Sequence, residues 1–188
     1  SNYSNWDSFA IGYSMYDYLT EELMPLIYHW YPVSDKREDN FIAGLSMGGG
    51  GTIKFAVNHP EKFAAAAILS SAPQNLRAID LATANSRTLT SIKNAGSLEA
   101  YINSYENVWD KLAELNGKGV LPRLYFACGT EDFLRERFLA FKRYAKEINL
   151  DATFEDGPGG HEWRFWDTYI QKALVFFGLD DRDAGNPF

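Results

Sequence analysis

Ser46 is the residue of this sequence whose surroundings best suit covalent chemistry. It lies in the run Gly44-Leu45-Ser46-Met47-Gly48, after a short apolar stretch and before a segment compatible with a helix. A Gly-x-Ser-x-Gly pattern in this setting presents a serine hydroxyl on a sharp strand-to-helix turn. We expect a strained backbone at Ser46, and glycines on both sides because a β-carbon there would clash. The pattern also occurs by chance, so an ordinary strand-to-helix turn is the alternative.

A serine hydroxyl is a weak nucleophile at neutral pH and needs a base that takes its proton and later returns it. His161 is the candidate base because it follows the last expected strand on a glycine-rich loop. Asp132 follows another expected strand, and a carboxylate can fix the histidine tautomer. The order serine, acid, histidine is the one that α/β-hydrolases use. The backbone amide of Met47, at the start of the helix, could then donate to a developing oxyanion.

Each partner of Ser46 has an alternative. Asp132 could cap the helix that follows it. Asp156 is a rival acid, although it precedes a Gly-Pro turn and suits a turn role better. His29 and His59 lie within or at the end of expected helices. Cys128, the only cysteine, lies inside an apolar strand, which argues against a nucleophilic role.

The segments around these residues alternate between strands and helices, which predicts a doubly wound, mostly parallel sheet with four visible strands. In such a sheet functional residues gather at the carboxyl ends of the strands. Strands are expected over 41–45, 64–69, 123–128 and 152–154, and the first two are expected to be buried. Helices are expected over 16–31, 47–59, 136–149 and 163–177, with a kink or break at Pro25 and a core-facing stripe Trp166, Tyr169, Ile170, Leu174 and Phe177 in the last one. The acidic tail, 178–188, is expected to fray.

Residues 74–119 contain no clear strand and are predicted to be an insertion within a single domain that spans 1–188. Helices are expected near 79–84 and 98–115. Such an insertion over a sheet edge usually shapes a pocket, and a crossover helix with a long linker is the alternative. Trp109 within it, and Trp163 beside His161, are candidates for substrate binding. Packing is the alternative for Trp163.

The composition limits the classes of partner. The net charge is −7 and the pI about 5.0, so neither nucleic acid nor an anionic membrane surface is expected to bind. A single cysteine allows no internal disulfide, and no apolar run approaches the length of a membrane span. The sequence predicts no metal and no cofactor. It fits a cytoplasmic or a secreted protein equally well.

Three motifs together resemble the esterase D-like group of α/β-hydrolases, which includes tributyrin, feruloyl (cinnamoyl) and acetylxylan esterases and S-formylglutathione hydrolases. They are Phe-Ile-Ala-Gly-Leu-Ser-Met-Gly-Gly from residue 41, Cys-Gly-Thr-Glu-Asp-Phe-Leu from residue 128, and Gly-Gly-His-Glu-Trp from residue 159. The resemblance implies an α/β-hydrolase fold with Ser46 as nucleophile, Asp132 as acid, His161 as base and the Met47 amide as half of an oxyanion hole. Glycine at position 50, where members commonly have tyrosine, looks more like the feruloyl and xylan esterase branch.

The sequence departs from this group at its start. The strands that precede residue 1 in the family, and the loop with the second oxyanion donor, are absent from the sequence, which looks like the C-terminal two-thirds of an esterase. We expect the remaining part to be present as a separate chain, produced by cleavage at an exposed loop. Processing or tag removal is the plainer explanation for a start at Ser1.

The predicted function is a serine carboxylesterase that forms an acyl-enzyme with small acyl or hydroxycinnamoyl esters, with esters of plant cell walls among the candidate substrates. A thioesterase like S-formylglutathione hydrolase and an acyltransferase would use the same residues. A non-catalytic binding protein that keeps the fold is the alternative from another class.

Overall fold

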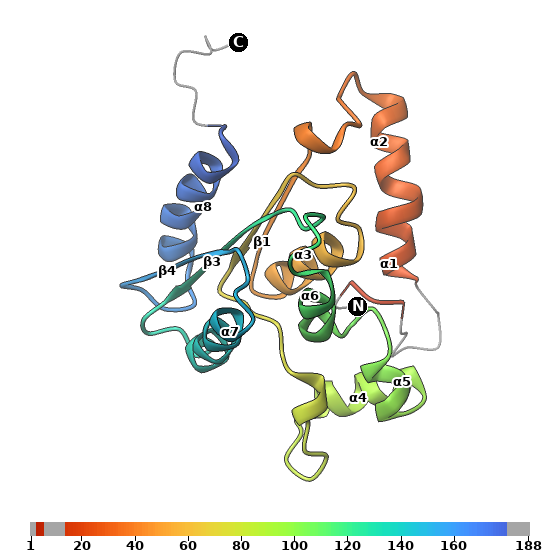
Figure 1. Ribbon diagram of the computed structural model, residues 1–188, viewed down its shortest axis with the longest axis vertical. Coiled ribbons are helices and arrows are strands. Elements are labelled where there is room, and N and C mark those ends of the chain that lie inside the picture. Colours follow the sequence, from red (N-terminus) through yellow and green to blue (C-terminus); the bar gives the residue numbers. More distant parts are fainter. Residues whose placement is uncertain (1–2, 6–13, 180–188) are drawn as a thin grey trace.

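The computed structural model describes residues 3–5 and 14–179. Four strands form one parallel sheet, between helices that lie on both of its faces (Figure 1). The strands are β1 (Phe41–Leu45), β2 (Ala65–Leu69), β3 (Arg123–Gly129) and β4 (Thr153–Gly157), and they lie side by side in the order of the sequence. The predicted parallel α/β sheet is therefore confirmed, and its carboxyl ends share one edge.

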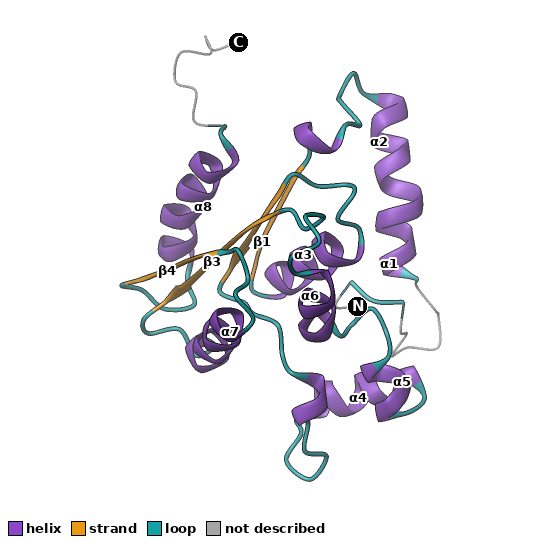
Figure 2. Cartoon of the chain, in the orientation of Figure 1, coloured by secondary structure: helices purple, strands orange, loops and turns teal. Residues whose placement is uncertain are grey.

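Figure 2 distinguishes the helices from the strands and loops. The α-helices are α1 (Met15–Asp17), α2 (Met24–Trp30), α3 (Met47–Asn58), α4 (Ser86–Ala95), α5 (Leu98–Ile102), α6 (Val108–Leu115), α7 (Arg135–Glu147) and α8 (Trp163–Phe177). A π-helix, η1 (Tyr18–Leu23), and the 3₁₀-helices η2 (Arg37–Asp39) and η3 (Leu76–Ala78) complete the set. In the described part of the chain, no helix combines the length and apolar character needed to cross a bilayer. The predicted tail beyond residue 179 lies outside the described residues.

The core has two halves, one on each face of the sheet. Side chains alternate along a strand, so Ala66 and Ile68 of β2 pack toward α3, α6 and α7 while Ala65, Ala67 and Leu69 pack toward α8. Every residue of β2 is buried. An apolar run of this kind is typical of a parallel strand that is covered on both faces.

The first predicted helix, 16–31, is nearly continuous in the structure and accommodates Pro25 without ending. Helix α1 runs into η1, and η1 runs directly into α2, which has Pro25 in its first turn. Proline has no N–H to donate to the preceding turn. The wider π-helical turns immediately before it therefore replace the predicted break.

Strand β1 was predicted to be buried, and this is wrong. Ala43 is exposed and the other four residues are half-buried. The reason is that β1 pairs with β2 alone among the described strands, which leaves its other edge open. A groove of about 780 Å³ runs beside this edge, with walls from η1, α2, α3 and α8.

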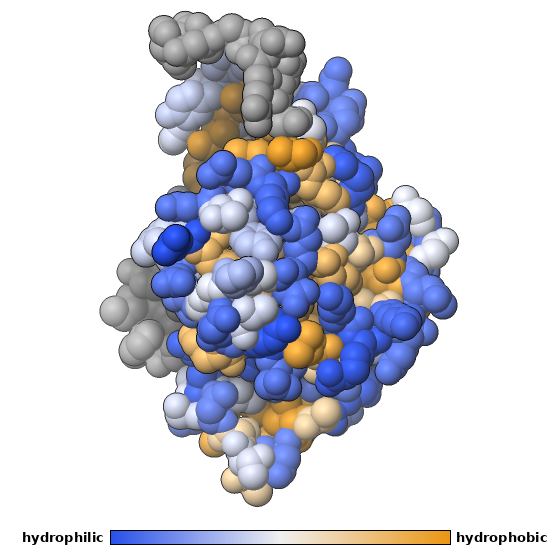
Figure 3. All heavy atoms as spheres, turned by 90° about the vertical axis from the view of Figure 1, so that its left-hand side faces the viewer, coloured by the Kyte–Doolittle hydropathy of each residue, from blue (hydrophilic) through white to orange (hydrophobic). Residues whose placement is uncertain are grey.

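The groove also explains one wrong prediction about α8. Trp166, Tyr169 and Phe177 are buried as expected, but Leu174 is 40% exposed and lines the groove. Val175, beside it, is also exposed. On the face that α8 occupies, Figure 3 shows apolar side chains among a larger number of hydrophilic ones.

The helices predicted within segment 74–119 are only partly confirmed. Residues 79–84 are not helical, and the helix before α5 is α4 instead. The predicted helix over 98–115 is divided into α5 and α6, and Asn107 caps α6 by accepting from the amide of Asp110. Val108 and Leu112 of α6 belong to the core beside α3. That the segment caps a substrate pocket stays a prediction.

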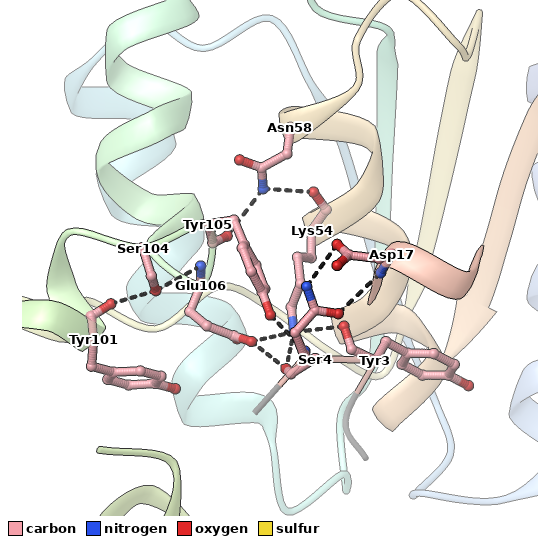
Figure 4. Close-up of polar contacts among 10 residues, drawn as sticks. Tyr3, Ser4, Asp17, Lys54, Asn58, Tyr101, Ser104, Tyr105 and Glu106 are labelled. Carbon is pink, nitrogen blue, oxygen red and sulfur yellow. Dashed lines mark hydrogen bonds and ion pairs between the residues drawn. The ribbon is translucent and has the colours of Figure 1, made fainter. Parts of the chain in front are cut away.

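A buried polar cluster ties residues 3–5 to α3 and to the loop before α6 (Figure 4). The Lys54 ammonium donates to Glu106 Oε1 at 2.8 Å and to Ser4 Oγ at 2.9 Å, and Ser4 also donates to Glu106. The amide of Asn5 donates to the hydroxyl of Tyr105 at 2.7 Å. Burial lowers the pKa of Lys54, which Glu106 partly offsets. We call Ser4, Lys54 and Glu106 the lysine cluster.

Candidate active site

Ser46 occupies the turn between β1 and α3 in a strained backbone conformation, with φ 53° and ψ −118°. Its amide donates to the carbonyl of Leu69 at the end of β2, at 2.9 Å. A β-carbon on Gly44 would lie 2.4 Å from the carbonyl oxygen of Gly48, so this position requires glycine. Among the described residues, the atom nearest to a β-carbon on Gly48 would be the Tyr3 hydroxyl oxygen at 3.9 Å, so the clash predicted there is wrong. The sharp turn therefore depends on the close approach of α3 to Gly44.

The four glycines at 48–51 form the first turns of α3 and not a loose loop. A β-carbon on Gly51 would lie 2.6 Å from the ring of Tyr3, and one on Gly49 would lie 3.0 Å from the carbonyl oxygen of Leu69. Glycine therefore lets both β2 and the Tyr3 ring approach the helix that begins beside Ser46.

The structure brings Ser46, His161 and Asp132 together. His161 Nε2 lies 2.7 Å from Ser46 Oγ, and His161 Nδ1 lies 2.9 and 3.1 Å from the two carboxylate oxygens of Asp132. Because the carboxylate faces Nδ1, that nitrogen carries the proton in neutral histidine and Nε2 is left to accept from the serine hydroxyl. Asp132 is buried, whereas His161 keeps 18% of its side chain exposed.

Asp132 does not cap the following helix, which was its alternative role, because α7 begins after Leu134 without a side-chain cap hydrogen bond. Its Oδ1 accepts from the amide of Leu134 at 2.8 Å, just before α7 begins. A carboxylate has enough lone pairs to hold this amide and the imidazole at once. The hydrogen bond from the Leu134 amide fixes the carboxylate that faces His161, so it supports the contact with the imidazole.

The loop that carries His161 is fastened to the loop that carries Asp132. The amide of Thr130 donates to the carbonyl of Gly157 at 2.8 Å, and the amide of Glu131 donates to the carbonyl of Gly159 at 3.1 Å. The amide of Gly159 donates to the carboxylate of Glu131 at 2.6 Å, which lowers the pKa of Glu131. The sequence reading missed Glu131. Its position next to Asp132 was the available signal.

The rival residues have other partners. Asp156 pairs with Arg135 at 3.1 Å and with Lys142 at 3.4 Å, and Arg135 lowers the pKa of Asp156. His59 Nε2 lies 2.9 Å from the hydroxyl of Tyr16. Cys128 is fully buried, and burial raises the pKa of its thiol to about 12. None of these three residues contacts Ser46 in the interactions of the described chain.

Two aromatic rings flank His161. The ring of Phe133 lies 4.5 Å from the imidazole, and the ring of Trp166 lies 5.0 Å from it, nearly perpendicular. Phe133 is 75% exposed, while Trp166 is buried and contacts Trp163 edge to face. The sequence reading assigned Trp166 only to the core and passed over Phe133.

The remaining predicted site residues stay predictions. Met47 is the first residue of α3, so its amide belongs to the first turn, whose N–H groups have no acceptor within the helix. Trp163 is 70% exposed near His161. Trp109 stacks on Tyr144 at 4.1 Å between α6 and α7, which are the contacts of a packing residue. In the described part of the chain, no group of three or more histidine, cysteine or acidic residues could hold a metal ion.

A parallel sheet with a strained serine after β1, a buried aspartate after β3 and a histidine after β4 defines the α/β-hydrolase fold with a Ser–His–Asp arrangement. The chain belongs to an esterase family, because the family model described as "Putative esterase" matches residues 1–177.

The comparisons with known proteins agree with this family. The chain is 30% identical over 168 residues to an acetyl esterase of Caldicellulosiruptor saccharolyticus, which covers 84% of this chain and 61% of that protein. The structure is similar to FphF, a fluorophosphonate-binding serine hydrolase of Staphylococcus aureus, with a TM-score of 0.73, 35% identity and coverage of 95% and 69% of the two chains.

An S-formylglutathione hydrolase (FrmB) of Staphylococcus aureus is similar with a TM-score of 0.72, 35% identity and coverage of 93% and 68%. A ferulic acid esterase is similar with a TM-score of 0.66, 25% identity and coverage of 93% and 63%. The chain thus spans about three-fifths of the length of the curated relative and about two-thirds of the length of these structures.

Proposed function

We propose that the protein to which this chain belongs is a serine carboxylic-ester hydrolase that works through an acyl-enzyme. The observation that carries the proposal is the 2.7 Å contact between His161 Nε2 and Ser46 Oγ, with the buried Asp132 on the other ring nitrogen. Ser46 is also only half-buried, which suits a residue that must meet a substrate.

In the proposed reaction His161 takes the proton of Ser46 while Ser46 Oγ attacks the ester carbonyl carbon. The negative charge that develops on the carbonyl oxygen is stabilised by the amide of Met47 and by a second donor. His161 then gives its proton to the departing alcohol, and the acyl group remains on Ser46. Water, activated by the same histidine, releases the acid and restores the serine.

For the substrate we propose small acyl esters and hydroxycinnamoyl esters. The names of the similar acetyl esterase and ferulic acid esterase support these acyl groups. The similar S-formylglutathione hydrolase favours a second candidate, a short-chain thioester. The test is to compare kcat/KM for acetyl, butyryl, octanoyl and feruloyl esters and for S-formylglutathione. Preference for octanoyl would contradict the first proposal, and preference for the thioester would replace it by the second.

We also propose that a further part of the same protein completes the site by adding a strand along β1 and the second oxyanion donor. The open edge of β1, the apolar groove beside it and the share of the relatives that this chain spans support this. Loss of one oxyanion donor costs roughly 10²–10³ in rate. Mass spectrometry of denatured, active protein should find polypeptide beyond these 188 residues. A single 21.3 kDa species with full activity would contradict the proposal.

A further inference from the structure

The buried ring of Trp166 packs against the imidazole of His161. Trp166 lies in the first turn of α8, is 8% exposed, and its ring meets the imidazole nearly at right angles at 5.0 Å. The hydrogen bonds to Asp132 and Ser46 fix the two nitrogens of His161. They leave the tilt of the ring to its packing partners, so Trp166 limits where Nε2 can point.

Trp166 is itself anchored to the end of β2. Its indole Nε1 donates to Ser70 Oγ at 2.9 Å, and the Ser70 amide donates to the carbonyl of Ala127 in β3 at 2.7 Å. Ser70 is fully buried. A chain of contacts therefore runs from the central strands through Ser70 and Trp166 to the imidazole.

The backbone at Ser70 is a second, independent sign that its hydroxyl matters. Ser70 has φ 48°, in the left-handed region where residues other than glycine and asparagine are disfavoured. Glycine would relieve this strain but would offer no acceptor to the indole N–H. A buried indole N–H without an acceptor would lose its hydrogen bonds to water and gain none in return.

We propose that Ser70 and Trp166 form a positioning pair for His161, which keeps Nε2 directed at Ser46 Oγ during proton transfer. The inference rests on the proposed hydrolase function. Trp166 acts through His161 and does not touch the reacting atoms. Because a displacement of about 1 Å can reduce a rate about 10²-fold, loss of the anchor lowers kcat and leaves KM nearly unchanged.

The test compares Trp166→Phe, which keeps an aromatic ring but removes the N–H, with Ser70→Ala, which removes the acceptor, and with the double variant. Tyr144→Phe is the matched control, because it removes a hydroxyl that donates to the carbonyl of Trp109, away from His161. The measurements are kcat and KM for p-nitrophenyl acetate, together with Tm.

We expect each single variant to lose about 10-fold in kcat with KM within twofold, and the double variant to lose no more than the larger single loss. Tyr144→Phe should keep the parent kcat. Parent-like kcat in a folded Ser70→Ala, multiplied losses in the double variant, or a change confined to KM would each overturn the positioning pair. A parent protein without esterase activity would instead refute the proposed function.

Discussion

Helix α3 carries two polar clusters about two turns apart, and they are built in opposite ways. At its start Ser46 meets His161 and Asp132, with 18% of the His161 side chain exposed. Further along, the lysine cluster encloses Lys54 and Glu106, whose side chains are 7% and 11% exposed. The first cluster has one open side and the second is closed by residues 3–5.

This contrast shows how one helix can serve both reactivity and stability. A nucleophile must be reached by its substrate, so its cluster is open at one side and is held in place by backbone strain and neighbouring loops. A buried ion pair must be shielded and fully hydrogen-bonded, because breaking it leaves an uncompensated charge. Substitutions at the two clusters should therefore separate activity from stability.

The largest effect is expected for Ser46→Ala. Removal of the nucleophile should lower kcat for p-nitrophenyl acetate by about 10⁴–10⁶-fold, because no other group can form the acyl-enzyme. Because alanine keeps the β-carbon and the position is only half-buried, Tm should stay within a few degrees of the parent. Steady-state kinetics and calorimetry check both expectations, and a variant as active as the parent would remove Ser46 from the mechanism.

Asp132→Asn should follow, with a loss of about 10⁴-fold in kcat, because an amide favours the wrong histidine tautomer. Asp156→Asn is the matched control, since Asp156 pairs with Arg135 and Lys142 and not with His161. Kinetics of the two variants side by side decide between the two acids. If Asp156→Asn caused the greater loss, the assignment of the acid would be wrong.

At the lysine cluster, Lys54→Met should lower the free energy of unfolding by about 3–5 kcal/mol, because Glu106 would remain buried without its partner. The folded enzyme should keep its kcat. Urea denaturation measures the stability, and Lys54→Met combined with Glu106→Leu should regain much of the loss. A tenfold fall in kcat with parental stability would show that the two clusters are not separate.

The smallest effect concerns Cys128. Its thiol ionises in the folded chain only near pH 12, against 9.0 for an unperturbed thiol. The unfolded chain therefore loses this proton first, and stability should fall as the pH rises above 9, by about 1 kcal/mol at pH 10. Denaturation of the parent and of Cys128→Ala at pH 8 and pH 10 should show the steeper decline in the parent. Equal declines would contradict the burial of the thiol.

The sequence alone was sufficient to predict the first cluster, in which Ser46 meets His161 and Asp132. Residues at the carboxyl ends of parallel strands meet at one edge, so Ser46, Asp132 and His161 could be placed together from their order alone. Helix α8 and the four strands were also located, because continuous apolar runs and helical spacing mark them clearly.

The second cluster could not be foreseen. Lys54 has the sequence surroundings of an ordinary helix residue, and only the folded chain brings Ser4 and Glu106 to it, from 50 and 52 residues away. The open edge of β1 and the contact between Ser70 and Trp166 could not be foreseen for the same reason. Burial, pairing and left-handed backbone are set by neighbours that are distant in sequence.

In the proposed mechanism His161 activates Ser46, and covalent labelling of the serine measures this activation. The intact protein is treated with a fluorophosphonate, digested, and the modified peptide is identified by mass spectrometry. We predict one adduct, on Ser46, with labelling at least 100-fold slower in His161→Ala, because the serine then lacks its base. An adduct on another serine, or equally fast labelling without His161, would contradict this mechanism.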